Sequence, residues 1–159
     1  MNKNILYIFL FAFIFSACEK DDICLSPTTP KLILRFYDNA NQSEFKAPAN
    51  LSIWAEGKDT ISTFKSVSLD SVFIPLKTNE TETIYNLKTS STGNIADNAY
   101  NKITINYITE EVFVSRSCGF KTIFNTITIT LDNGWVQSFT PNSLTTIDNE
   151  TKAHVKIYH

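Results

Sequence analysis

The feature that most constrains the fold is a short-range alternation of apolar and polar residues. It is clearest in the second half of the chain, in KITINYIT (residues 102–109) and NTITITL (residues 125–131). A period of two places successive side chains on opposite faces of a strand, whereas an amphipathic helix needs a period near 3.6. The abundant Thr and Ile also favour strands. The sequence therefore predicts an all-β fold.

The same alternation predicts further strands between turn signals. In the segment 66–76 the alternation slips by one residue near Asp70, which predicts a bulge or a turn, and Pro75 predicts an edge strand or a strand end. Residues 91–101 are expected to form a loop. Seven to nine short strands predict an antiparallel β-sandwich, for which we expect an immunoglobulin-like topology. The other predicted strands lie at residues 31–37, 51–56, 82–89 and 153–158.

Two connections are predicted in the second half. A change in alternation at Glu110-Glu111 predicts a tight turn or bulge, after which Val112, Arg116 and Cys118 would share an inward face. Residues 121–139 predict a hairpin that turns at Asp132-Asn133-Gly134. A two-residue loop would pair Leu131 with Val136. A three-residue loop with a left-handed Gly134 would pair Leu131 with Trp135 and is preferred, because one face then becomes apolar throughout.

The N-terminus predicts a lipoprotein signal. The apolar run from Ile5 to Phe15 would span about 17 Å as a helix, about half of a hydrocarbon core. Phe15-Ser16-Ala17-Cys18 resembles a lipobox, in which a large apolar residue and two small ones precede an acylated cysteine. We therefore expect a signal peptide over 1–17, lipid attachment at Cys18, an acylated tether over 18–29 and a single domain over 30–159.

The residues after Cys18 bear on localisation. Glu19 stands where an aspartate would resemble an inner-membrane retention signal, so the outer membrane is favoured. Lys20, Asp21 and Asp22 resemble the export signal of Bacteroidetes-type surface lipoproteins. The alternative is a merely solvated tether on a periplasm-facing protein. We expect the cell surface.

Two cysteines remain once Cys18 is acylated. An even number in an oxidising compartment predicts a disulfide between Cys24 and Cys118. A metal or redox site is not expected, because the chain has no CxxC motif and only His154 and His159 as histidines. No cofactor is predicted.

Charge and motifs exclude several functions. The formal net charge is −2 with only two arginines, which does not suit nucleic acid. There is no GxSxG motif, and the carboxylates are scattered, so no catalytic residue is predicted. Tyr37 and Trp54 alternate with apolar residues and are candidates for an exposed aromatic platform that binds a ligand. Thr60 and Ser71 stand in Asp-Thr-Ile and Asp-Ser-Val, which resemble O-glycosylation sites of exported Bacteroidetes-type proteins.

TTPKLILRFYD, DSVFIPL and FVSRSCGFK, in that order behind the lipobox, resemble a family of small Bacteroidetes-type lipoproteins of unknown function. The resemblance implies a lipoprotein with one compact domain and supplies no substrate. We expect a lipid-anchored outer-membrane envelope protein with a structural or binding role and no enzymatic activity. Its partners would be the membrane, through the lipid, and an envelope protein or a glycan. The alternative is a carbohydrate-binding accessory module.

Overall fold

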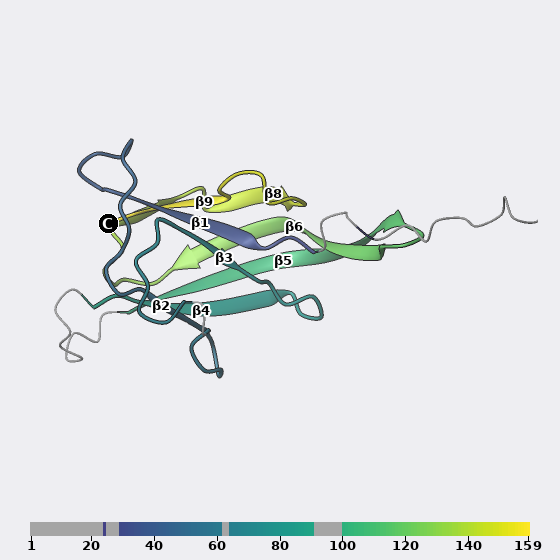
Figure 1. The fold of residues 1–159 in the computed structure, drawn as a ribbon, viewed down its shortest axis with the longest axis horizontal. Helices are drawn as coiled ribbons and strands as arrows, with labels where there is room; N and C mark the ends of the chain where they lie inside the picture. Colours follow the sequence, from purple (N-terminus) through teal and green to yellow (C-terminus); the bar gives the residue numbers. More distant parts are fainter. Residues whose placement is uncertain (1–23, 25–28, 62–63, 91–99) are drawn as a thin grey trace, which may run out of the picture.

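The structure, a computed structural model, describes residues 24, 29–61, 64–90 and 100–159. The described residues form two stacked β-sheets (Figure 1). Their nine strands are β1 (Leu32–Tyr37), β2 (Ser52–Ala55), β3 (Ser71–Ile74), β4 (Glu82–Lys88), β5 (Tyr100–Ser115), β6 (Gly119–Leu131), β7 (Ser138–Thr140), β8 (Ser143–Ile147) and β9 (Val155–Tyr158).

The strand order confirms a sandwich and corrects its topology. One sheet has the order β3-β1-β9-β7 and the other β2-β4-β5-β6-β8. Immunoglobulin domains instead carry the order A-B-E-D in one sheet, with the first strand at an edge. Here the first and last strands, β1 and β9, are central and pair in parallel, whereas the other pairs are antiparallel. The immunoglobulin-like expectation was therefore wrong in its strand order.

The alternating residues form the core as predicted. Leu32, Leu34 and Phe36 of β1 are fully buried between the sheets, and β3 begins directly after Asp70 and ends before Pro75 at a sheet edge. The apolar face of each strand meets the apolar face of the opposite sheet. The other fully buried apolar residues of this core are Leu51, Ile53, Val72, Ile74, Leu87, Ile103, Ile105, Phe124, Ile127, Ile147, Val155 and Ile157.

The predicted turn at Glu110-Glu111 was wrong. Both residues lie inside the continuous strand β5 and pair with Ile123 and Thr122 of β6. Two register shifts occur between β5 and β6, one between Phe113 and Ser115 near the end of β5 and one farther back that belongs to the partner strand. Asn106 pairs with Thr128 and Ile108 with Asn125, so Thr126 is the extra residue of a bulge and has a φ of 52°.

Beyond the bulge, β5 and β6 leave the body of the sandwich as a two-stranded ribbon. We call residues 108–125 the arm and residues 113–120 its tip. β4 accompanies β5 only as far as Asn106, and β8 accompanies β6 only as far as Phe124. Figure 1 shows the arm projecting at the end of the molecule opposite the C-terminus. From the last core pair, Thr109 and Phe124, to the tip the ribbon extends about 14 Å.

The predicted hairpin at Asp132–Gly134 was also wrong. β6 ends at Leu131 and pairs with β8, whereas β7 lies in the other sheet and pairs with β9. Residues 132–137 therefore cross between the sheets. Gly134 does not have a positive φ, so neither loop considered for the hairpin is present.

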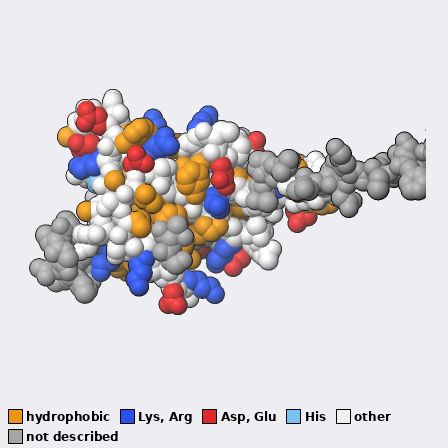
Figure 2. All heavy atoms as spheres, viewed as in Figure 1, with side chains coloured by type: hydrophobic (Ala, Val, Ile, Leu, Met, Phe, Trp, Pro, Cys, Tyr) orange, Lys and Arg blue, Asp and Glu red, His pale blue; other side chains and the backbone are white. Residues whose placement is uncertain are grey.

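The described residues include no helix long and apolar enough to cross a membrane. On the face drawn in Figure 2, Lys and Arg side chains alternate with Asp and Glu among apolar groups. This described face therefore has no patch of a single charge sign.

Candidate functional site

An open cavity lies on the outer face of the five-stranded sheet. Trp54 of β2 pairs directly with Asn86 of β4, which pairs with Lys102 of β5. Directly paired residues point to the same face of a sheet. These three side chains therefore form one row across three strands, beneath a cavity of about 310 Å³ that is also lined by Glu56, Gly57, Lys58 and Tyr100.

Two aromatic rings form one wall of the cavity. Tyr100 lies two residues before Lys102 on β5 and therefore shares its face. The Trp54 and Tyr100 ring centroids are 6.1 Å apart and the planes are tilted by 49°. Trp54 is half-buried, whereas Tyr100 is 47% exposed. The pair therefore offers an accessible aromatic surface beside polar groups.

Glu56 is the acidic side chain of the cavity and lies beside the amide of Asn86 and the ammonium group of Lys102. Asn86 Nδ2 donates to Glu56 Oε2 at 3.0 Å, and Lys102 Nζ donates to Glu56 Oε1 at 3.3 Å. These two hydrogen bonds, in that order of effect, lower the pKa of Glu56 below its ordinary value. Glu56 is therefore a carboxylate at neutral pH, and Asn86 is held in a fixed orientation.

The side chains that line this cavity offer several groups for binding a ligand. Glycoside hydrolysis commonly needs two carboxyl groups about 5 to 9 Å apart. Among the residues that line the cavity, Glu56 is the single carboxylate, and it is occupied by Asn86 and Lys102. Aromatic rings beside a carboxylate, an amide and an ammonium group can stack on an apolar ring face and bond hydroxyl groups.

Tyr37, the other predicted platform aromatic, is not available. Its side chain is 8% exposed and packs between Phe45 and Tyr158, at centroid distances of 5.1 and 5.6 Å. Lys156 Nζ lies 5.5 Å from its ring centroid. The loop after β1 folds back over the sheet through the Tyr37–Phe45 bridge, and this covers the face that the sequence suggested would be open.

The two histidines have structural contacts. Ile33 N–H donates to His154 Nδ1 at 3.0 Å. His154 Nε2 lies 3.0 Å from the Asn149 carbonyl oxygen and donates to it, because a carbonyl oxygen can only accept. Burial lowers the pKa of His154. His159 packs edge-on against Trp135 at 5.2 Å. Within the described residues no three His, Cys, Asp or Glu side chains gather as a metal site would require.

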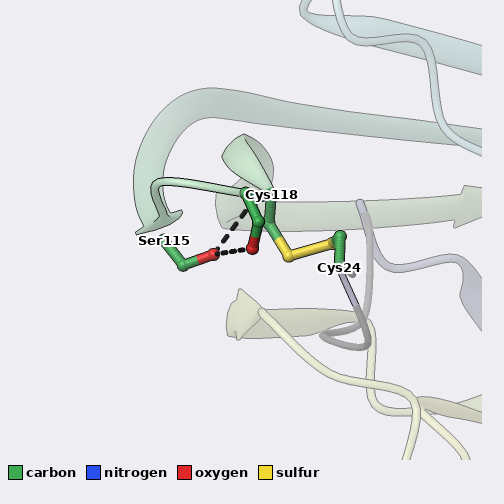
Figure 3. Close-up of a disulfide and its surroundings, with 4 residues drawn as sticks. Cys24, Ser115 and Cys118 are labelled. Atoms are coloured by element: carbon green, nitrogen blue, oxygen red, sulfur yellow. Dashed lines mark hydrogen bonds between the residues drawn. A yellow bond between two sulfur atoms is a disulfide. The ribbon is translucent and has the colours of Figure 1, made fainter. Parts of the chain in front are cut away.

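The predicted disulfide is confirmed, but its surroundings are not those expected. Cys24 and Cys118 are bonded at the tip of the arm (Figure 3), and Ser115 Oγ accepts from Cys118 N–H at 3.1 Å. Cys118 was expected to face the core. Because β5 keeps its alternation through Glu110-Glu111, Val112 lies on the face opposite to that of Tyr107, and Arg116 is exposed to solvent instead of pointing inward.

The two glycosylation candidates differ. Thr60 is half-buried and bridges to Trp54, beside the cavity. The Ser71 hydroxyl oxygen is buried in β3 and has no hydrogen-bond partner among the described residues. The folded chain therefore does not offer Ser71 for modification, which corrects that expectation. Cys18, Lys20, Asp21 and Asp22 lie outside the described residues.

Sequence reasoning missed most of this cavity. Tyr100 was placed in a loop, although it begins β5, and Asn86, Lys102 and Glu56 were not singled out. The available signal was the polar face of residues 82–89 and 102–109 beside Trp54. It could be used only once β2, β4 and β5 were known to be neighbours.

Comparison with known proteins places residues 50–159, more than half of the chain, in a family described as DUF6452, a family of unknown function. The chain belongs to the DUF6452 family. No curated protein and no solved structure matches it.

The DUF6452 match includes the cavity and leaves out the N-terminal part of the domain. Trp54, Glu56, Tyr100 and Cys118 all fall inside the matched residues. Strand β1 and Cys24 fall outside them, although β1 is central in its sheet and Cys24 closes the disulfide. In this DUF6452 chain, residues that precede the matched part therefore complete the four-stranded sheet and the end of the arm.

Proposed function

We propose that this DUF6452 chain is a lipid-anchored, non-enzymatic protein of the outer-membrane envelope that binds a ligand outside the cytoplasm. The observation that carries the proposal is the disulfide between Cys24 and Cys118. Disulfides persist in oxidising compartments. This bond begins six residues after Cys18, the acylation candidate of the lipobox, so it is consistent with export of the chain.

The test of anchoring is Cys18→Ser in the full chain, followed by membrane fractionation and mass measurement. We expect the unaltered protein to carry fatty acids and pellet with outer membranes, and the variant to keep its signal peptide or become soluble. Maturation and membrane association unchanged by Cys18→Ser would contradict the proposal.

Surface exposure is a separate part of the proposal and rests on Lys20, Asp21 and Asp22. Protease added to intact cells should degrade the protein if it faces outward. Replacement of these three residues by alanine should protect it while leaving the lipid in place. Protection of the unaltered protein would place it on the periplasmic side.

A second, more specific function is carbohydrate binding at the cavity. It is supported by the accessible Trp54–Tyr100 pair beside the Glu56 carboxylate and Asn86. A sugar ring could stack on the aromatic pair while its hydroxyl groups replace water on these polar side chains. The lining carries one acidic side chain, Glu56, against two basic ones, Lys58 and Lys102, so its charge suits a neutral or an anionic sugar.

This second function can be tested with an array of envelope polysaccharides, measured by change in tryptophan emission and by calorimetry. Tyr100→Ala and Glu56→Gln should each weaken binding about tenfold or more, as loss of a stacking or charged contact does. Phe73→Ala is the matched control, because Phe73 is similarly exposed at 41% but lies on β3 in the other sheet. Equal losses with Tyr100→Ala and Phe73→Ala would argue against this site.

A further inference from the structure

The tip of the arm carries a pair of exposed aromatic rings. Phe113 and Phe120 are directly paired across β5 and β6, and their ring centroids are 5.4 Å apart in an edge-on arrangement. Phe113 is 57% exposed and Phe120 is 65% exposed. Exposed apolar side chains that form a contiguous patch mark a candidate interaction surface.

The pair lies on the continuation of the core face. On β5, Tyr107, Thr109, Glu111 and Phe113 alternate onto one side, and on β6 the side chains of Phe124 and Phe120 occupy that same side. Tyr107 and Phe124 are buried against the opposite sheet, with ring centroids 5.0 Å apart. The arm reaches past that sheet, so the last two aromatics of this face have no sheet opposite them.

The N-terminal segment is fastened at the same place. Cys24 is bonded to Cys118 within the tip (Figure 3). Farther along the arm, Thr122 N–H donates to Thr29 Oγ1 at 3.1 Å. The chain therefore reaches the sandwich by way of the arm. The C-terminus lies at the other end of the molecule (Figure 1).

We propose that the tip of the arm inserts Phe113 and Phe120 into the interfacial region of the lipid bilayer to which Cys18 is attached. The inference rests on the proposed lipid anchor. Cys24 is the sixth residue after Cys18, and a chain of that length spans at most about 21 Å. A lipid on Cys18 thus keeps the tip within that distance of the membrane surface.

The chemistry of the tip suits this occupant. Aromatic side chains favour the boundary between acyl chains and headgroups, and apolar area buried there adds to the anchoring by lipid. Arg116 is exposed and is the only charged residue of the tip. Its guanidinium can pair with the phosphate groups of membrane lipids, whereas Glu110 and Glu111 lie behind the tip on the arm.

The function of such a contact would be orientation. A flexible lipid anchor alone lets a domain rotate freely above the membrane. A second contact through the arm fixes the direction of β5 relative to the membrane. Tyr100 is the first residue of this strand and lies about 43 Å from Phe113 along it. The cavity at Trp54 and Tyr100 would then face away from the lipid.

The test uses full-length acylated protein, purified from membranes and reconstituted into vesicles that contain brominated phospholipids, which quench nearby tryptophan. Phe113→Trp and Phe120→Trp place a reporter at the tip, and Tyr100→Trp is the matched control at the other end of β5. Emission from Trp54 and Trp135 is subtracted with the unaltered protein. We expect brominated lipid to remove most of the emission added at positions 113 and 120, and none of that added at position 100.

The outcomes separate the inference from the anchor. Protein that floats with the vesicles but shows no quenching at positions 113 and 120 keeps its lipid and overturns the inference. Protein that carries no lipid and does not float overturns the proposed function and the inference with it.

A second measurement avoids tryptophan variants. Vesicles should slow trypsin cleavage at Arg116, and the double variant Phe113→Ser with Phe120→Ser should lose that protection. Equal cleavage with and without vesicles also overturns the inference.

Discussion

The side chain of Asn101 occupies the space that a Cβ on Gly134 would fill. A Cβ built on Gly134 would lie 2.6 Å from Asn101 Oδ1. Asn101 is completely buried, accepts a hydrogen bond from Val136 N–H at 3.0 Å and donates to the Asp132 carbonyl oxygen. One side chain from β5 thus holds the segment that carries the chain from one sheet to the other.

Asn101→Ala should destabilise the protein by about 2 kcal/mol, because it leaves the buried Val136 N–H unpaired and removes the bond to the Asp132 carbonyl oxygen. Gly134→Ala should also destabilise it, because its methyl group cannot enter the space of Asn101. The double variant should cost less than the sum of the two single ones, since removal of the Asn101 side chain makes room for the methyl group. Urea unfolding measures all three, and simple additivity would contradict this account.

Thr126→Asn should stabilise the protein by about 0.5 to 1 kcal/mol. Thr126 is exposed at the bulge with a φ of 52°, a region that a β-branched residue adopts at a cost and that asparagine tolerates. Thr128→Asn is the matched control, since Thr128 is exposed on the same strand in regular pairing and asparagine is a poorer strand residue. The two substitutions should shift the urea midpoint in opposite directions.

Loss of the disulfide should cost about 2 to 4 kcal/mol, since the bond closes a loop between residues 94 apart in sequence. The arm should respond first, because a two-stranded ribbon is marginal on its own. Hydrogen exchange with and without reductant is the measurement. We expect residues 113–120 to lose protection before Ile103 and Ile105 of the core do. Simultaneous loss along the whole of β5 would show that the arm is not a separate unit.

His154 should make the protein less stable in mild acid. Its pKa is lowered by burial, so the unfolded chain binds a proton there more readily than the folded one. Stability from this group is complete above the unfolded pKa of about 6.5 and is lost as the pH falls through the folded value. His154→Asn keeps an acceptor for Ile33 N–H without titrating near neutrality. Denaturant unfolding between pH 5 and 7 should show a weaker pH dependence in the variant, and equal slopes would contradict this role.

Tyr85 should resist ionisation at alkaline pH. Burial, with a smaller effect of Tyr107, raises its pKa to about 12, and its hydroxyl donates to the Pro75 carbonyl oxygen at 2.6 Å. The unfolded tyrosine loses its proton near pH 10, so this group lowers stability as the pH rises from 10 towards 12. Absorbance titration at 295 nm of the protein and of Tyr85→Phe should differ by one late-titrating group. A difference near pH 10 would contradict the burial argument.

The strands could be predicted because their signal is local. Alternation within Lys31–Tyr37 or Ala153–Tyr158 depends on which side chains meet the opposite sheet, and burial of Leu32, Leu34 and Ile157 agrees with it. The disulfide followed from counting cysteines once Cys18 was set aside for lipid attachment. That prediction rested on the stability of disulfides in oxidising compartments and not on any geometry.

The connections could not be predicted because their signal lies in other parts of the chain. Asp132–Gly134 has hairpin chemistry, and only the bonds from Asn101, about 30 residues earlier, show that it crosses between sheets instead. The change of alternation at Glu110 looked like a turn, although β5 continues through it without a break and leaves the body of the sandwich there, so its apolar side chains no longer mark a buried face. The cavity was missed for the same reason, since its side chains come from three strands whose order a sequence does not state.

The parallel pairing of β1 with β9 has a consequence for biogenesis. Leu34 pairs with Val155 and Tyr37 with Tyr158, so β1 has only its antiparallel neighbour β3 to pair with until β9 is also available. On the export route that we propose, the N-terminal part of the chain emerges first, and the edge of β1 that β9 later covers stays open until β9 has followed. A chain exported in this way would gain from a chaperone that shields this open edge from aggregation.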